Sequence, residues 1–153
     1  MSVELKLKTP TPVEMAEVMH GTLEIYGEYD ANIPQTGLTT NSKEAGDGII
    51  FCAIRGSRVD GSDFIAEAVQ AGSRCFICQR LPDNAKNCGL PFCAILVDDV
   101  IAAIGTLAGW YRGFSKAKFV GITGSVGKTT TKEFVAAVAS AAFKTHKTKG
   151  NLN

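Results

Sequence analysis

The sequence predicts an α/β protein in which a small α/β unit precedes the start of a parallel-sheet, phosphate-binding unit. Short apolar runs alternate with amphipathic segments before residue 115, which is typical of folds built from β–α units. An apolar run at 119–122 leads directly into a glycine-rich turn and then a helix. Lys116 and Lys118 mark the seam between the two parts. We therefore expect one unit at 1–115 and a second at 116–153.

The composition indicates an ordinary globular protein. Hydrophobic residues make up 45% and charged residues 20% of the 153 positions. The net charge of +1 gives no electrostatic reason to expect a nucleic acid or an acidic membrane as partner. No apolar run approaches the roughly 20 residues that span a bilayer, and residues 1–6 lack a signal-peptide core. A cytoplasmic location is the resulting expectation.

The first expected helix begins after Thr11. Thr11, Pro12 and Glu14 form a capping-box pattern with proline at the first helical position. This pattern predicts a helix that continues to about His20. Two short strands are then expected, at 22–26 and 38–40.

A repeating strand–helix pattern follows. Further strands are expected at the apolar runs 49–54, 74–79 and 92–97, and a polar loop is expected at 81–91. One helix is expected at 63–71 with Ser62 as its cap. The next begins at Asp98 and Asp99, whose carboxylates suit a helix N-terminus, and ends near Gly113.

A loop rich in glycine, serine and arginine follows the strand at 49–54. Arg55, Gly56, Ser57 and Arg58 come directly after its apolar run. Such a loop could bind an anionic ligand, or it could be an ordinary solvated surface loop. The residues alone leave both interpretations open.

Five cysteines raise the question of a metal site. The spacing of Cys75, Cys78, Cys88 and Cys93 resembles that of zinc ligands, whereas the odd total argues against a disulfide framework. Cys75 and Cys78 lie in a strand-like run, where their side chains would point to opposite faces. We therefore favour core cysteines over zinc ligands.

The strongest chemical motif lies at 118–131. Gly124 and Gly127 allow a tight turn whose N–H groups can approach a ligand closely. Lys128 can reach terminal phosphate oxygens, and Thr129 offers a hydroxyl to a phosphate-bound Mg²⁺. A helix expected at 128–142 directs its positive end at the same place. The alternative is an ordinary strand-to-helix turn with a surface lysine.

This motif departs from the general phosphate-loop spacing by one residue. The general spacing places the first glycine at Ile122, but the chain has Gly121. A strand expected at 143–147 would complete one β–α–β unit. Because a single such unit cannot bury both faces of a parallel sheet, we expect the second unit to be incomplete and poorly stable by itself.

Taken together, these segments resemble the Mur ligase family. The stretch 121–131 resembles the ATP loop of that family, including the offset glycine. The segments 40–43, 46–47, 51–56 and 60–65 are similar to its N-terminal substrate domain. Within the family, the ending 147–153 looks most like the ligase that adds D-alanyl-D-alanine to UDP-N-acetylmuramoyl-tripeptide.

The resemblance implies an ADP-forming ligase of peptidoglycan synthesis. Residues 1–115 would be the UDP-sugar-peptide substrate-binding domain, and 116–153 the first β–α–β segment of an incomplete ATP-binding domain. In this family ATP converts the substrate carboxylate to an acyl phosphate, and the amine of D-alanyl-D-alanine then displaces phosphate. ATP and Mg²⁺ are the implied cofactors. The complete enzyme is expected to be a monomer, and this fragment is expected to be inactive alone.

The resemblance also assigns residues to the two sites. Lys128 and Thr129 are the implied catalytic residues, with Thr129 as the Mg²⁺ ligand. The implied ATP-binding residues are Gly124, Ser125, Val126, Gly127, Lys128, Thr129 and Thr130. The implied substrate-binding residues are Asn41, Ser42, Lys43, Arg55, Gly56, Asp60 and Asn151.

Three other interpretations stay open. The chain could belong to a Mur ligase that forms the tripeptide, which residues after Asn153 would decide. It could be a P-loop kinase or another NTPase, although the substrate-like first unit argues against this. It could also be a module that binds a UDP-sugar without catalysis, which turnover by the chain would exclude.

Overall fold

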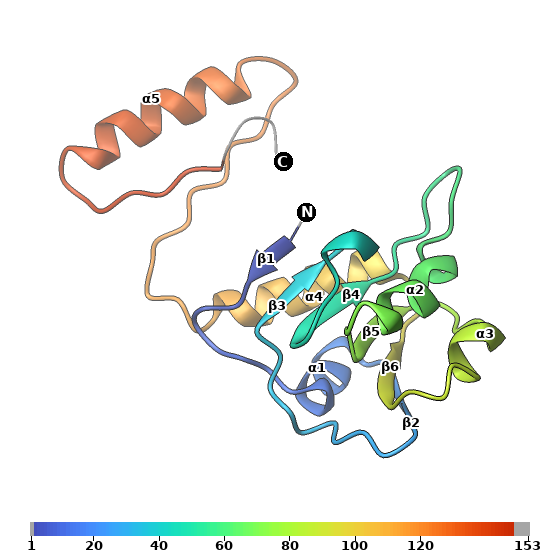
Figure 1. Ribbon diagram of the computed structural model, residues 1–153. Helices are drawn as coiled ribbons and strands as arrows, with labels where there is room; N and C mark the ends of the chain where they lie inside the picture. Colours follow the sequence, from blue (N-terminus) through green and yellow to red (C-terminus); the bar gives the residue numbers. More distant parts are fainter. Residues whose placement is uncertain (1, 149–153) are drawn as a thin grey trace. The chain divides into compact units, whose positions relative to one another are not determined.

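The computed structural model describes residues 2–148 and divides the chain into two units, Met1–Lys116 and Ala117–Asn153 (Figure 1). The strands of the first unit are β1 (Ser2–Glu4), β2 (Thr22–Tyr26), β3 (Gly37–Thr39), β4 (Ile49–Cys52), β5 (Cys75–Cys78) and β6 (Phe92–Leu96). Its α-helices are α1 (Pro12–Met19), α2 (Ile65–Gln70), α3 (Asp83–Lys86) and α4 (Val100–Arg112). Short 3₁₀ turns lie at Ser42–Glu44 and Gly61–Phe64. None of the helices described between residues 2 and 148 has the length and apolar character needed to cross a bilayer.

The first unit is built on one mixed sheet of six strands in the order β1-β3-β4-β5-β6-β2. The four central strands β3, β4, β5 and β6 run parallel, and the edge strands β1 and β2 are antiparallel to their neighbours. The carboxyl ends of the four parallel strands therefore meet at one edge of the sheet. Loops that leave this edge are where ligands bind in open α/β sheets.

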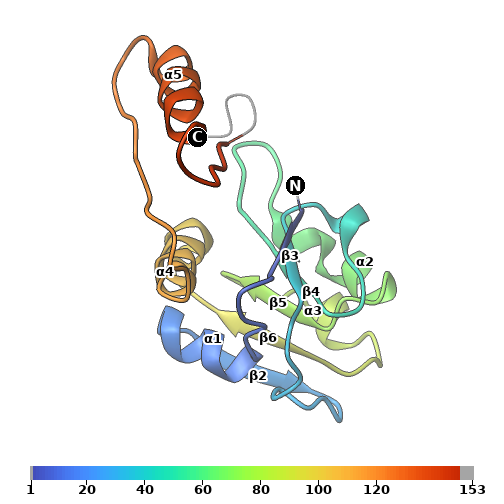
Figure 2. The same ribbon diagram turned by 90° about the vertical axis from the view of Figure 1, so that its left-hand side faces the viewer.

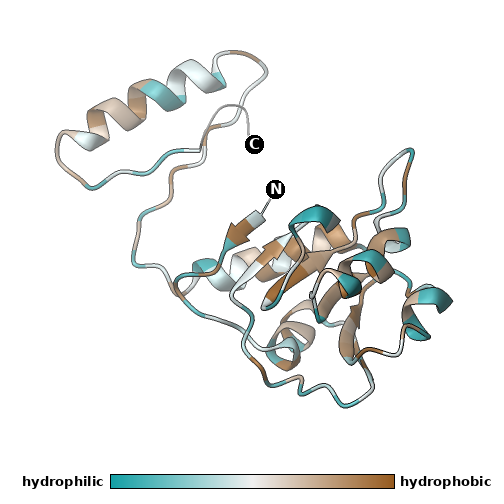
Figure 3. Cartoon of the chain, in the orientation of Figure 1, coloured by the Kyte–Doolittle hydropathy of each residue, from teal (hydrophilic) through white to brown (hydrophobic). Residues whose placement is uncertain are grey.

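Both faces of the sheet are covered, which confirms the predicted α/β class. On one face, Cys52, Cys75 and Ile95 pack with buried residues of α1 and α4. On the other face, Phe76 and Phe92 pack with residues of α2 and α3. Figure 2 shows the two helix pairs on opposite sides of the sheet, and Figure 3 shows the apolar character of the central strands. This layered core holds the carboxyl edge of the sheet in place.

The cysteine side chains divide between the two faces of the sheet, as predicted. Cys75 belongs to the cluster under α1 and α4, whereas Cys78 belongs to the cluster under α2 and α3. Cys52 and Cys93 are also buried, and Cys88 is partly exposed. Because Cys75 and Cys78 lie on opposite sides of the sheet, they cannot share one zinc ion. Within residues 2–148, no group of three potential metal ligands comes together.

Side-chain caps fix the starts of the two helices on the first face. The predicted capping box of α1 is confirmed: Glu14 N–H donates to Thr11 Oγ1 at 3.2 Å, and Thr11 N–H donates to Glu14 Oε2 at 3.0 Å. Asp99 caps α4 by accepting hydrogen bonds from Ile101 N–H at 2.7 Å and Ala102 N–H at 3.0 Å. Each cap satisfies N–H groups that the helix itself leaves without an acceptor.

The expected helix at 63–71 begins differently from the prediction. Ser62 does not cap the helix: Asp60 caps a 3₁₀ turn, Gly61–Phe64, by accepting the Ser62 N–H at 2.9 Å, and α2 begins after Phe64 without a side-chain cap. A 3₁₀ turn therefore precedes α2, and the Ser62 side chain is buried beneath it. The expected polar loop at 81–91 also contains the short helix α3.

The second unit contains the predicted helix, α5 (Lys128–Ser140), but not the predicted strands. Neither 119–122 nor 143–147 is a strand, and every strand pair that the structure describes lies in the first unit. A strand is stabilised by a neighbouring strand, which this segment does not provide. Phe134 and Val138 on α5 are 70% and 74% exposed, so the helix has little core around it.

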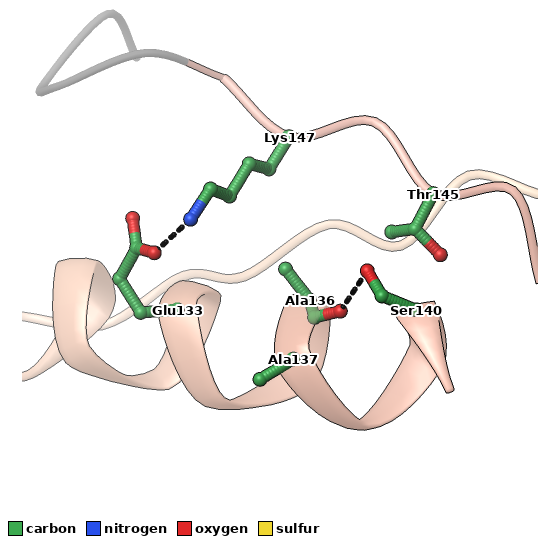
Figure 4. Close-up of a pocket in the computed structure, with 6 residues that line it drawn as sticks. All are labelled: Glu133, Ala136, Ala137, Ser140, Thr145 and Lys147. Carbon is green, nitrogen blue, oxygen red and sulfur yellow. Dashed lines mark hydrogen bonds and ion pairs between the residues drawn. The ribbon is translucent and has the colours of Figure 1, made fainter.

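The segment after α5 is held to the helix by polar contacts. Lys147 forms an ion pair with Glu133, and Lys132 Nζ donates to the Thr148 carbonyl at 2.9 Å. Glu133, Lys147, Ala136 and Ser140 are among the residues that line a shallow pocket here (Figure 4). Because these residues are already paired or small, the pocket offers few groups for ligand recognition.

Candidate functional site

The glycine-rich turn before α5 has the backbone conformation of a ligand-binding loop. Gly124 has a φ of +147° and Gly127 a φ of +81°, conformations that residues with side chains rarely adopt. A Cβ atom added to Gly127 would meet no atom within 4 Å. The backbone conformation, rather than lack of space, therefore requires glycine at 127.

The N-terminus of α5 lacks the side-chain cap that α1 and α4 possess. Gly127 occupies the cap position, and no side chain there accepts a hydrogen bond from the helix. The hydrogen-bond ladder of α5 begins at Thr131 N–H, which donates to the Gly127 carbonyl at 2.9 Å. The first turn thus directs backbone N–H groups and the positive end of the helix dipole outward, which is the arrangement that binds phosphate.

Lys128 adds a positive charge to this turn. Its Nζ donates to the Gly124 carbonyl at 2.6 Å, so its side chain lies along the loop. Val126 at the tip of the loop is 90% exposed, and Thr129 at the first turn of α5 is also exposed. These donors fit a polyphosphate. The Thr129 hydroxyl is an oxygen ligand of the kind that Mg²⁺ accepts beside phosphate oxygens.

A second group of predicted site residues lies at the carboxyl edge of the sheet in the first unit. Ser42 and Lys43 follow β3, and Arg55 and Gly56 follow β4. Since β3 and β4 are parallel neighbours, the fold brings these two loops to adjacent positions. The four residues that the sequence analysis grouped as one site therefore lie on adjacent loops of the fold.

Asn41 has a structural task in the first of these loops. Its Oδ1 accepts the Lys43 N–H at 3.2 Å, and its Nδ2 donates to Glu44 Oε1 at 3.2 Å. Buried Thr39 donates to Glu44 Oε2 at 3.0 Å. These hydrogen bonds from Thr39 and Asn41 lower the pKa of Glu44. Asn41 thus shapes the turn that carries Ser42 and Lys43.

The loop after β4 closes into a narrow turn. Arg55 and Asp60 pair as an antiparallel bridge, and Gly56 N–H donates to the Val59 carbonyl at 2.8 Å. A Cβ atom on Gly56 would lie 3.1 Å from the same carbonyl, which is a close approach. Arg55 and Arg58 are both exposed, so the turn presents two cations at the edge of the sheet.

Asp60 is engaged within the protein on both carboxylate oxygens. Its Oδ1 accepts the Ser62 N–H, and its Oδ2 accepts a hydrogen bond from Arg80 Nε at 3.0 Å. Arg80 Nη2 also donates to Asp63 Oδ1 at 2.5 Å. Burial raises the pKa of Asp60, but the hydrogen bonds from Ser62 and Arg80 outweigh it, so the pKa lies below its usual value.

Arg80 is a residue at this edge that the sequence analysis did not identify. It follows β5 just as Arg55 follows β4, and this repeated position was the available signal. Asn151, the remaining predicted substrate contact, lies outside the described residues, as does the rest of the Gly-Asn-Leu-Asn ending.

Two family descriptions match successive parts of the chain. Residues 35–109 match the Mur ligase family, catalytic domain, and residues 122–153 match the Mur ligase middle domain. A UDP-N-acetylmuramoyl-tripeptide–D-alanyl-D-alanine ligase of Bacillus subtilis is 33% identical over 144 residues, covering 94% of this chain and 30% of that protein. A UDP-N-acetylmuramoyl-L-alanyl-D-glutamate–2,6-diaminopimelate ligase of Chlorobium phaeobacteroides is 31% identical, covering 78% of this chain and 23% of that protein.

Solved structures give the same result. A crystal structure of MurF from Acinetobacter baumannii covers 99% of this chain and 31% of its own, with 33% identity and a TM-score of 0.75. MurF ligase from Thermotoga maritima, in complex with ADP, covers 76% of this chain and 26% of its own, with 36% identity and a TM-score of 0.65. The chain spans about a third or less of the length of these relatives. With both of its parts matched in order, the chain belongs to the Mur ligase family.

Proposed function

We propose that the chain is the front part of an ATP-dependent ligase that joins D-alanyl-D-alanine to UDP-N-acetylmuramoyl-tripeptide. The Bacillus relative of this name covers 94% of the chain, and the Thermotoga relative was solved with ADP. The observation that carries the proposal is the uncapped N-terminus of α5, where Gly127 and Lys128 present N–H groups and a cation. Such a turn suits the terminal phosphates of a nucleoside triphosphate.

In this proposal the second unit holds the phosphates of ATP. The N–H groups from Gly124 to Thr130 would bind phosphate oxygens, and Lys128 would exchange its bond to the Gly124 carbonyl for one to a phosphate. Thr129 would hold Mg²⁺, which when bound neutralises phosphate charge. The contribution of these residues is positioning and electrostatic stabilisation of the transferring group.

The first unit would bind the UDP-sugar-peptide. Ser42 offers a hydroxyl, and Lys43 and Arg55 offer cationic donors, to an anionic substrate at one edge of the sheet, where the tight turn closed by the Gly56 N–H carries Arg55. The reaction itself would proceed in two balanced steps. The substrate carboxylate attacks the γ-phosphorus and releases ADP, and the amine of D-alanyl-D-alanine then attacks the acyl carbon and releases phosphate and a proton.

A tripeptide-forming ligase is the second candidate, because the Chlorobium relative also matches the chain. Calorimetric titration of this chain tests both. We expect UDP-N-acetylmuramoyl-tripeptide to bind more tightly than UDP-N-acetylmuramoyl-L-alanyl-D-glutamate, with weaker binding of Mg-ATP. Preference for the shorter UDP compound would favour the tripeptide-forming ligase. Tight Mg-ATP binding without any response to either UDP compound would indicate a different kind of NTPase.

A further inference from the structure

The guanidinium of Arg80 connects two strand ends at the proposed substrate edge. It lies just beyond β5, yet the two carboxylates that it binds, those of Asp60 and Asp63, lie in the segment that follows β4. Its Nε binds Asp60 at 3.0 Å and its Nη2 binds Asp63 at 2.5 Å. One planar fork thus bridges two carboxylates, a geometry that a lysine ammonium cannot reproduce with the same direction and reach.

The bridged segment is pressed against the end of β4. Gly61 N–H donates to the Ile54 carbonyl at 3.0 Å, and a Cβ atom on Gly61 would lie 2.7 Å from backbone atoms of Ala53 and Ile54. Asp60 immediately precedes this contact and pairs with Arg55 across the turn. The carboxylate that Arg80 holds and the backbone bridge that orients Arg55 therefore belong to the same residue.

Resting on the proposed function, we propose that Arg80 is a positioning residue for the UDP-sugar-peptide. By holding Asp60 and Asp63, it fixes the turn 55–60 so that Arg55 faces the anionic substrate. Asp60 then acts through this turn and does not contact the substrate, since both of its oxygens are occupied within the protein. Arg80 shapes the site through these two carboxylates and itself need not touch the ligand.

The direction in which one substitution changes the binding affinity distinguishes a positioning role from simple electrostatics. Removal of the Asp63 carboxylate makes the edge more positive, so electrostatics alone predicts tighter binding of an anion. If Asp63 instead helps to hold the turn in place, its removal should weaken binding. Asp63 is suited to this test because its side chain is 58% exposed, so that its loss leaves the core intact.

The experiment is a calorimetric titration of the chain and its variants with UDP-N-acetylmuramoyl-tripeptide. We expect Arg80→Ala and Asp63→Ala each to weaken binding about fivefold, the upper range for a partly exposed ion pair. Arg80→Ala should have little further effect in the Asp63→Ala, Asp60→Asn background. Hydrogen exchange at the Gly56 and Gly61 amides should accelerate in the same variants, because these amides close the turn.

Two control variants remove one cation and one carboxylate at positions away from this turn. Lys6→Ala removes an exposed cation near the opposite edge, where Glu4 of β1 pairs with Gly37 at the start of β3. Glu67→Ala removes an exposed carboxylate from α2. Both should bind like the unmodified chain.

The outcomes are distinct. Binding by the unmodified chain together with tighter or unchanged binding by Asp63→Ala would overturn the positioning role and leave the proposed function standing. If Arg80→Ala weakens binding equally in the unmodified chain and in the Asp63→Ala, Asp60→Asn background, Arg80 contacts the ligand directly. That result would also overturn the positioning role. Absence of binding by the unmodified chain would overturn the proposed function and this inference together.

Discussion

The Nζ of Lys128 lies 2.6 Å from the Gly124 carbonyl oxygen, so the lysine spans the glycine-rich loop that precedes its own helix. The side chain is thereby already directed along the surface where phosphates would bind. Only a local exchange of hydrogen-bond acceptor is needed for it to reach a ligand.

Replacement of Lys128 by alanine tests the lysine directly. In a complete ligase that carries this sequence, Lys128→Ala should lower turnover on the order of a hundredfold, because a group that stabilises transferring charge is lost. Binding of the UDP compound should remain nearly unchanged. Lys144→Ala removes an exposed lysine beyond α5 and serves as control. Near-normal turnover of Lys128→Ala would contradict its role at the phosphate.

Gly127→Ala tests the backbone conformation of the loop. With φ at +81°, an alanine would be strained by about 1–2 kcal/mol in this conformation. We expect weaker binding of Mg-ATP, measured by calorimetry. Gly121→Ala is a matched control, since a Cβ atom there meets nothing within 4 Å and Gly121 does not have a positive φ. Equal effects of the two substitutions would argue against a conformational role for Gly127.

The neighbouring residues Asp98 and Asp99 should differ in their contribution to stability. Asp99 accepts two N–H hydrogen bonds at the start of α4, so Asp99→Ala should lower the free energy of unfolding by about 1 kcal/mol. Asp98→Ala removes the same charge but no cap. Urea unfolding followed by circular dichroism compares the two variants, and the cap assignment fails if they lose the same stability.

Stability should depend on the ionisation of Glu14. A hydrogen bond from Lys8 and one from the Thr11 N–H lower the pKa of this carboxyl from 4.5. A lowered folded-state pKa stabilises the fold above pH 4.5, and this contribution is lost as the pH falls through the folded-state value. Glu14→Gln should therefore flatten the decline in urea midpoint below that pH. Glu17→Gln, an exposed change in α1, should leave the decline as it is.

The sequence predicted much of the first unit because its signals were local. The Thr11–Glu14 capping box, the apolar run of β4 and the helix after Asp99 each depend on residues close in the chain. β1 was missed because its three residues are exposed and are ordered by pairing with distant β3. Ser62 was expected to cap the helix because serine is a good capping residue, but Asp60 caps a 3₁₀ turn that precedes α2, and Gly61 lies against the backbone of Ala53 and Ile54 just beyond β4.

The candidate site was predictable where chemistry resides in a single motif. The glycines and Lys128 follow one another, so a phosphate-binding role could be proposed for them from their order alone. Arg80 was missed because its role comes from an ion pair across 20 residues with Asp60, and its position after β5 indicates an arginine at this edge without indicating that partner. The strands expected beside the phosphate loop depend on neighbours that the described residues do not supply.

The edge position of β2 has a consequence for synthesis of the protein. β2 is translated early, yet its register partner is β6, with Thr22 opposite Leu96. The ribosome must therefore release residues up to 96 before this strand can pair. Helix α1 likewise cannot pack against α4 until the still later residues of α4 have been released. Nascent chains halted before β6 should leave residues 12–26 accessible to protease, and the unit should become resistant in one late step.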